Sequence, residues 1–225
     1  MPRIGVFGGS FNPIHFGHLL VADEVYETLG LDRVLFVPAG QPPHKPAADL
    51  APVRDRYEMT ALAAREHRGF EVSDVEVRRS GPSYTVDTLS ALQGEGDLFL
   101  LIGSETFLDL LSWREPATIV RLARLVVVPR HSMGFDPQTP AAQKVLTALG
   151  MPAFEPPVVV ASDRTPVSPS DVASPRAPLL VHAASLPISG SDLRRRAREG
   201  RSLAYRMPES VAAYIHEHRL YGARP

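Results

Sequence analysis

Short apolar runs alternate with amphipathic segments along most of this chain. Runs typical of buried strands occupy residues 3–7, 34–37, 70–75, 98–102, 125–128 and 179–181. Apolar residues at helical spacing predict helices over 17–29, 53–67, 86–92 and 141–149, another from Ser191, and a last one near 208–218. Apolar strands that alternate with helices are typical of a doubly wound, mostly parallel sheet with helices on both faces. We therefore expect an α/β fold of this class.

Residues 133–178 depart from this rhythm. Nine prolines lie in the stretch, and its periodicity fades apart from the helix expected at 141–149. A loop-rich insertion explains such a pattern better than a second core does. We therefore predict a single domain over residues 1–225, with the insertion at about 133–178.

The composition narrows the function classes. The chain has 225 residues, and 44% of them are hydrophobic, which is enough for a substantial core. It has no cysteine, so disulfides, thiolate catalysis and thiolate metal sites are excluded. The net charge of −1, the lack of a long apolar run and the lack of a signal-peptide pattern give no indication of nucleic acid, membrane or secretion. We expect a cytosolic protein with a small-molecule partner; homo-oligomerisation is left open.

The most informative segment is the glycine-rich turn at residues 8–18, which reads GGSFNPIHFGH. Glycines let main-chain amides approach a polyphosphate, and the following helix directs its first N–H groups and its dipole at the same anion. His15 and His18 are three residues apart, so both rings can lie on one side of the helix and donate to phosphoryl oxygens. A zinc site or a pair of helix-capping histidines are the alternatives, although no carboxylate has convincing ligand spacing. Neither a Walker A motif nor a G-x-G-x-x-G follows the first strand.

Residues 187–194, which read PISGSDLR, form a second helix start suited to phosphate. Ser189 and Ser191 can cap the helix or bond phosphate oxygens, and Arg194 can reach the same face with a forked, permanent charge. Taken alone, the segment is better explained as a capped surface helix with a solvated basic run. Two such helix starts in one chain change that balance, because a polyphosphate offers several phosphate groups to be bound. We assign Arg194 to the site, and Arg195 and Arg196 mostly to the solvated surface.

The two segments resemble the motifs of the nucleotidyltransferase superfamily that carries (H/T)-x-G-H and I-S-x-(S/T)-x-(I/L)-R. Further features resemble its bacterial nicotinate-nucleotide adenylyltransferases: His15 opens the first motif, P-P-H-K occupies 42–45, S-Y-T occupies 83–85, I-G-S-E occupies 102–105, and Trp113 follows at the family's spacing. The resemblance covers residues 3–130 and 179–221 and implies a Rossmann-like nucleotidyltransferase fold. Glu105 stands where the family has an aspartate at the ATP ribose.

The resemblance implies a role for each matching residue. The groups implied to stabilise charge during the transfer are His15, His18, Lys45 and Arg194. The residues implied to bind ATP are Gly8, Gly9, Ser10, Phe11, His18, Gly103, Glu105, Ile188, Ser189, Ser191 and Arg194. The residues implied to bind the acceptor are Asn12, His44, Ser83, Tyr84, Thr85, Asp109, Trp113 and Arg130.

Physical chemistry supports several of these assignments. Thr85 opens a predicted helix, so its N–H and hydroxyl can meet the carboxylate of a nicotinate ring. Trp113 can stack on a flat heteroaromatic ring, and is equally compatible with a core or interface anchor. Lys45 offers a mobile ammonium to phosphates, or is an ordinary exposed lysine. Asp109 can bond the acceptor's ribose, or is an ordinary exposed carboxylate.

The implied reaction is direct, in-line transfer of AMP from ATP to nicotinate mononucleotide, giving nicotinate adenine dinucleotide and pyrophosphate for NAD biosynthesis. Mg²⁺ is the implied cofactor, held mainly by the ATP phosphates and without a metal site built from protein side chains. One alternative is an adenylyltransferase for nicotinamide mononucleotide or another phosphorylated acceptor. The other is a non-catalytic nucleotide-sensing module, which two complete motifs disfavour because a sensor needs no transition-state donors.

Overall fold

The computed structural model describes residues 1–43, 46, 48, 50–129, 134–154, 158–159 and 176–223. Its strands are β1 (Arg3–Gly9), β2 (Arg33–Pro38), β3 (Phe70–Val72), β4 (Asp97–Gly103), β5 (Arg124–Val128), β6 (Val158–Val159) and β7 (Leu179–His182). Its α-helices are α1 (Phe16–Leu29), α2 (Val53–Ala64), α3 (Thr85–Leu92), α4 (Ser104–Leu108), α5 (Pro116–Leu122), α6 (Pro140–Ala148), α7 (Gly190–Arg198) and α8 (Glu209–Glu217). Two short 3₁₀ helices are η2 (Leu110–Ser112) and η4 (Leu220–Gly222).

The strands pair in the order β3-β2-β1-β4-β5-β7-β6. The pairings of β1 with β4, β4 with β5, β5 with β7 and β6 with β7 are all parallel. The order reverses direction between β1 and β4, which is the arrangement of a doubly wound sheet. The predicted α/β fold class is confirmed.

The chain divides into two compact units, each built from three separate stretches. Unit 1 comprises Met1–Phe7, Val21–Val34 and Tyr84–Ser185, and unit 2 comprises Gly8–Leu20, Leu35–Ser83 and Leu186–Pro225.

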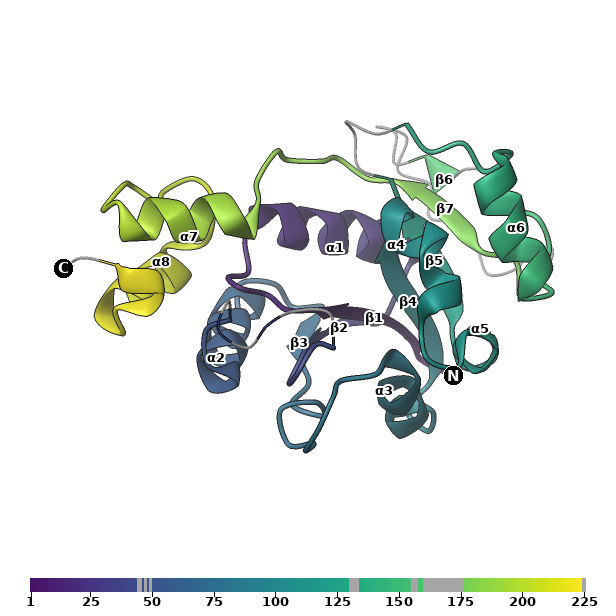
Figure 1. Cartoon of the computed structure of the whole chain (residues 1–225), viewed down its shortest axis with the longest axis horizontal. Helices are drawn as coiled ribbons and strands as arrows, with labels where there is room; N and C mark the ends of the chain where they lie inside the picture. The colour runs from purple at the N-terminus through teal and green to yellow at the C-terminus, as the bar shows by residue number, and fades with distance from the viewer. Residues whose placement is uncertain are drawn as a thin grey trace. The chain divides into compact units, whose positions relative to one another are not determined.

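Unit 1 is organised around the buried strand β4, which lies between β1 and β5 in the sheet (Figure 1). Its apolar run from Leu98 to Ile102 is buried at every position, as expected for a parallel strand covered on both faces. Leu101 lies opposite Val126 of β5, so the interior of the sheet is made of branched side chains. Gly5 of β1 belongs to the same packing, because a Cβ there would lie 2.9 Å from the side chain of Leu31.

The proline-rich stretch contributes structure to unit 1 within the part that is described. Phe135 and Phe154 pack edge-on against Phe107 of α4, with ring centroids 5.9 and 5.1 Å away. Helix α6 buries one face, and β6 pairs with the edge strand β7. Apolar spacing predicted the helix, but the sequence analysis predicted neither the aromatic cluster nor the strand.

Unit 2 contains the helices α2, α7 and α8, the strand β3 and the 3₁₀ helix η4. Helix α2 packs on α8, and η4 packs on α7. Tyr214 of α8 donates a 2.8 Å hydrogen bond to Asp55 of α2. Burial and this hydrogen bond raise the pKa of Tyr214 to about 12.

The predicted elements are all present, with two shorter than expected. The helix predicted at 53–67 ends at Ala64, and the strand predicted at 70–75 ends at Val72. Helices α4 and α5 were not predicted because each is seven residues or fewer, too short for periodicity to show. Helix α5 starts with Pro116 directly after Glu115, whose φ of +51° is left-handed and fixes the start of the helix.

Candidate active site

The turn between β1 and α1 is fixed through its main chain in unit 2. The carbonyl of Gly9 accepts a 2.8 Å hydrogen bond from the amide of Ala39. Phe11 follows with a φ of +40° and a side chain that is almost fully buried. A non-glycine residue in this left-handed region costs on the order of 1 kcal/mol or more, so packing of the Phe11 ring has to maintain it. The turn is therefore held in a strained conformation by its main-chain hydrogen bond and by the packing of Phe11.

His15 and His18 meet at the start of α1. Their rings stack with centroids 3.8 Å apart and an interplanar angle of 23°. The ring of Phe11 lies edge-on against His18 at 5.2 Å. The amide of His18 donates to the carbonyl of His15 over 2.9 Å, so the first helical turn itself sets the spacing of the pair. Both imidazoles lie on one side of the helix, as the sequence spacing predicts.

Asn12 is the point at which four parts of unit 2 meet. Its side-chain oxygen accepts hydrogen bonds from the Ala51 amide at 3.0 Å and from the Tyr221 hydroxyl at 2.9 Å. Its main-chain carbonyl accepts one from Nη1 of Arg194 at 2.8 Å. Burial raises the pKa of Tyr221, while the charges of Arg194 and Arg56 act in the opposite direction. Asn12 therefore links the first motif to the second motif and to the C-terminal 3₁₀ helix.

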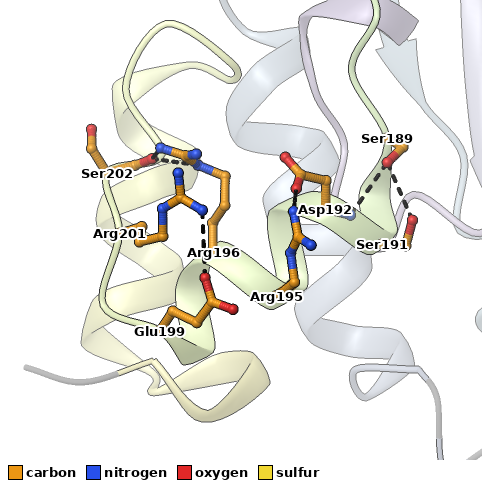
Figure 2. A network of polar contacts seen from close by, with 8 residues as sticks. All are labelled: Ser189, Ser191, Asp192, Arg195, Arg196, Glu199, Arg201 and Ser202. Carbon is orange, nitrogen blue, oxygen red and sulfur yellow. Dashed lines mark hydrogen bonds and ion pairs between the residues drawn. The ribbon is translucent and has the colours of Figure 1, made fainter.

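Helix α7 begins with a serine cap. The Ser189 hydroxyl accepts from the Asp192 amide at 3.2 Å and lies 3.2 Å from the Ser191 hydroxyl (Figure 2). Gly190 allows the helix to approach the first motif, because a Cβ there would lie 3.0 Å from the Asn12 carbonyl. This helix start presents two hydroxyls and the first N–H groups of a helix, which suit phosphate oxygens.

The arginines of α7 have different surroundings. Arg194 is half-buried against Asn12, whereas Arg195 pairs with Asp192 on the surface and Arg196 donates twice to the Ser202 carbonyl (Figure 2). Arg194 thus has different surroundings from its two neighbours, and its assignment to the site stays a prediction.

Unit 1 contains a second group of the expected residues. Thr85 is the first residue of α3, directly after Tyr84, and the guanidinium of Arg114 lies over the Tyr84 ring at 4.8 Å. Gly103 ends β4, and the exposed Glu105 lies in the first turn of α4. An exposed aspartate, Asp109, ends that helix, and the half-buried Trp113 ends η2.

Within the ranges that the structure describes, no three histidine or carboxylate side chains are grouped so as to hold a metal ion. No helix in those ranges is long and apolar enough to cross a membrane. The starts of α1 and α7 carry imidazoles, hydroxyls and the guanidinium of Arg194, groups that suit phosphate oxygens.

Comparison with known proteins assigns the family. A model of the cytidylyltransferase-like family matches residues 6–196. A probable nicotinate-nucleotide adenylyltransferase from Roseiflexus sp. is 40% identical over 220 residues, covering 97% of each chain. Another, from Thermus thermophilus, is 41% identical over 222 residues, covering 97% of this chain and 99% of the relative. The chain belongs to the nicotinate-nucleotide adenylyltransferase family.

A solved structure supports the fold of this family member. The nicotinic acid mononucleotide adenylyltransferase of Plasmodium falciparum, complexed with NaAD, superposes with a TM-score of 0.72 over 100% of this chain and 99% of that chain. At 17% identity, this likeness shows the fold alone. The resemblance, the nucleotidyltransferase class and the Rossmann-like fold expected from the two motifs are confirmed.

The expected site residues of this family member fall into three sets. Within unit 2, hydrogen bonds and ring contacts bring together the first motif and the start of α7, and the same unit contains Ser83, whose hydroxyl accepts from the Gln41 amide. Unit 1 contains Tyr84, Thr85, Gly103, Glu105, Asp109 and Trp113. Outside the described residues lie His44, Lys45 and Arg130. The roles assigned to individual residues stay predictions.

Sequence analysis missed two residues whose side chains donate hydrogen bonds to the first motif. Tyr221 reaches Asn12 across 209 positions, and nothing local in the sequence indicates this contact. Arg56 lies on α2 and donates to the carbonyl of Ser10. A signal for Arg56 existed: it shares one helical face with Met59, Thr60 and Ala63, so it occupies a position where an apolar residue is expected.

Proposed function

We propose that this chain transfers AMP from ATP to nicotinate mononucleotide, giving nicotinate adenine dinucleotide and pyrophosphate. The observation that carries the proposal is the arrangement in unit 2, where the stacked His15 and His18 and the start of α7 are connected through Asn12. Near-complete relatives named as nicotinate-nucleotide adenylyltransferases support the choice of acceptor. We place the activity in NAD biosynthesis and in the cytoplasm.

The reaction is a direct displacement. An oxygen of the acceptor's 5′-phosphate attacks the α-phosphorus of ATP, the bond from that phosphorus to the β-phosphate bridging oxygen breaks, and pyrophosphate leaves. His15 and His18 donate hydrogen bonds to phosphoryl oxygens on which charge builds, and Arg194 stabilises the polyphosphate with its guanidinium. Lys45 is assigned to the same work. The acceptor already carries a good nucleophile, so no covalent intermediate with the protein is needed.

The chemistry of this site suits a magnesium ion that is held by the substrate. Mg²⁺ keeps several waters and binds through substrate phosphates when few carboxylates are offered. The phosphate-facing groups described here are hydrogen-bond donors and cations, which bind phosphate oxygens and leave the metal to the nucleotide. Once bound, the ion would neutralise charge on the phosphates.

The start of α3 gives a physical reason for nicotinate rather than nicotinamide. A carboxylate near the N-terminus of a helix gains about 0.3–1 kcal/mol at an exposed site. Asp87 already lies in the first turn of α3 and interacts with the same helix dipole, so we use this lower range. An amide would face N–H donors with its own NH₂ group, and badly paired polar groups cost roughly 1–3 kcal/mol more.

Steady-state kinetics with saturating ATP and a panel of mononucleotides tests the proposal. We expect pyrophosphate release with nicotinate mononucleotide, and a kcat/KM on the order of ten- to a thousand-fold above that for the nicotinamide form. A reversed preference would transfer the assignment to the nicotinamide substrate. Nucleotide binding without pyrophosphate release for any acceptor would identify a sensing module.

A further inference from the structure

Arg56 is a buried arginine whose hydrogen bonds go to three carbonyls in two loops of unit 2, the β1–α1 turn and the connection between β2 and α2. The side chain is 1% exposed. Nη1 donates to the Ser10 carbonyl at 2.8 Å, Nη2 to the Gly40 carbonyl at 3.1 Å, and Nε to the Ala51 carbonyl at 3.0 Å. One guanidinium therefore connects the first motif, the loop after β2 and the residues before α2.

The bond to Ser10 fixes a peptide group in the middle of the anion-binding turn. The Ser10–Phe11 peptide is trans, so its N–H points away from the direction of its carbonyl. Arg56 holds that carbonyl, and thereby fixes the direction of the Phe11 amide. The Ala39 amide holds the Gly9 carbonyl, and Arg194 holds the Asn12 carbonyl, in the same manner. Three carbonyls of one turn are thus turned towards donors of the protein, which an anion-binding loop requires because carbonyl oxygens repel phosphate.

Arg56 also supplies a positive charge next to this turn. Burial lowers the pKa of Arg56, and the neighbouring Tyr221 and Glu76 act in the opposite direction. An arginine stays protonated in proteins even when its pKa is lowered. Burying a cation costs free energy that an apolar side chain of similar size would not, so stability alone is a poor reason for an arginine here.

We propose that Arg56 is a positioning residue for ATP: it fixes the orientation of the Ser10–Phe11 peptide and places a permanent positive charge behind the turn that binds the polyphosphate. The inference rests on the proposed function and adds a residue outside both motifs to it. Arg56 acts through the turn and does not itself form or break a bond.

Equilibrium binding of a non-hydrolysable ATP analogue to the full chain tests the proposal. Arg56→Lys keeps the charge but lacks the fork that reaches three carbonyls, and Arg56→Gln keeps N–H donors but lacks the charge. We expect each folded variant to bind the analogue about tenfold more weakly or worse. We also expect the KM for ATP to rise while the KM for the mononucleotide stays within about twofold. Loss of stability alone would reduce the active fraction and leave both KM values unchanged.

Arg54 provides a matched control on the same helix, because its side chain is exposed. Arg54→Lys and Arg54→Gln should bind the analogue as the wild type does. A folded Arg56 variant with wild-type affinity would overturn the proposal. Failure of both Arg56 variants to fold would assign the residue to stability and overturn it too. Analogue binding by the wild type without transfer to any mononucleotide would overturn the proposed function alone, and a wild type that does not bind the analogue would overturn both.

Discussion

The rings of His15 and His18 stack in a space that Gly17 leaves open. A Cβ on Gly17 would lie 3.0 Å from Nδ1 and 3.1 Å from Cε1 of His15, closer than nearly all real contacts of a Cβ. The glycine of the H-x-G-H motif thus has a steric reason: it allows the imidazole of His15 to lie back along the helix. At the residue scale, the sequence could predict the two histidines, because their spacing is local. The geometry adds the reason why position 17 is a glycine.

Gly17→Ala should separate stability from activity. Alanine is the better helix former, so the free energy of unfolding should stay unchanged or rise by about 0.5–1 kcal/mol. The new methyl displaces the His15 ring, and a small misplacement of a catalytic group lowers kcat by about ten- to a hundred-fold. Urea denaturation and initial-rate assays measure the two effects. Gly94→Ala, where a Cβ would meet nothing within 4 Å, is the control and should leave kcat unchanged. A wild-type kcat in folded Gly17→Ala would show that the ring position does not matter.

At the scale of helices and strands, the sequence could predict where helices start. It could not predict which residues, distant in the sequence, form hydrogen bonds with the first motif. Ser189 marks the start of α7 because capping is a local interaction between near neighbours in the sequence, and the apolar spacing of residues 86–92 marks the start of α3 just after Tyr84. Tyr221 and Arg56 support the first motif over separations of 209 and 46 residues. A single sequence does not show which of many polar residues will be brought together by folding, so both residues emerged only from the structure.

Tyr221→Phe should weaken the link between η4 and the first motif. Loss of the hydroxyl should lower the free energy of unfolding at pH 8 by about 0.5–1.5 kcal/mol. The loss stays in this range because the Asn12 side-chain oxygen still accepts a hydrogen bond from the Ala51 amide and is not left unsatisfied. Burial raises the pKa of Tyr221, so above about pH 10 the unfolded chain releases this proton before the folded protein does. The contribution of Tyr221 to the unfolding free energy of the wild type therefore falls as the pH rises. The Tyr221→Phe variant lacks this pH dependence, because phenylalanine has no proton to release.

The difference in unfolding free energy between wild type and Tyr221→Phe should accordingly narrow between pH 8 and pH 11. Urea denaturation at both pH values measures it. Tyr205→Phe is the control, because Tyr205 is 95% exposed and its replacement should change nothing at either pH. A difference that grows with pH would contradict the buried, protonated hydroxyl.

At the scale of the whole molecule, the alternation of apolar runs and amphipathic segments predicted the fold class. It did not predict that the chain divides into two compact units. Each compact unit is assembled from three separate stretches, and such non-local packing leaves no periodic signal. The proline-rich stretch illustrates the limit: its composition indicated loops, whereas Phe135 and Phe154 pack on Phe107 in unit 1. Aromatic residues in a segment without periodicity can belong to a core that only the fold reveals.

We predict that residues 133–178 contain no essential catalytic group, and two helix caps allow this prediction to be tested at one polar residue of the stretch, Thr139. Thr139 caps α6 within this stretch and accepts from the Ala142 amide, and Ser189 caps α7 at the candidate site and accepts from the Asp192 amide. Replacing either by alanine removes the same kind of hydrogen bond, so each should lower the free energy of unfolding by about 0.5–2 kcal/mol.

Only Ser189→Ala should lower kcat/KM for ATP, because only that hydroxyl is placed to meet phosphate oxygens. Thr139→Ala should keep kcat within a few-fold, and initial rates measured beside urea denaturation decide between the two. A folded Thr139→Ala protein without activity would place a catalytic requirement in the proline-rich stretch, and equal losses in the two variants would mean that the α7 start acts through stability alone.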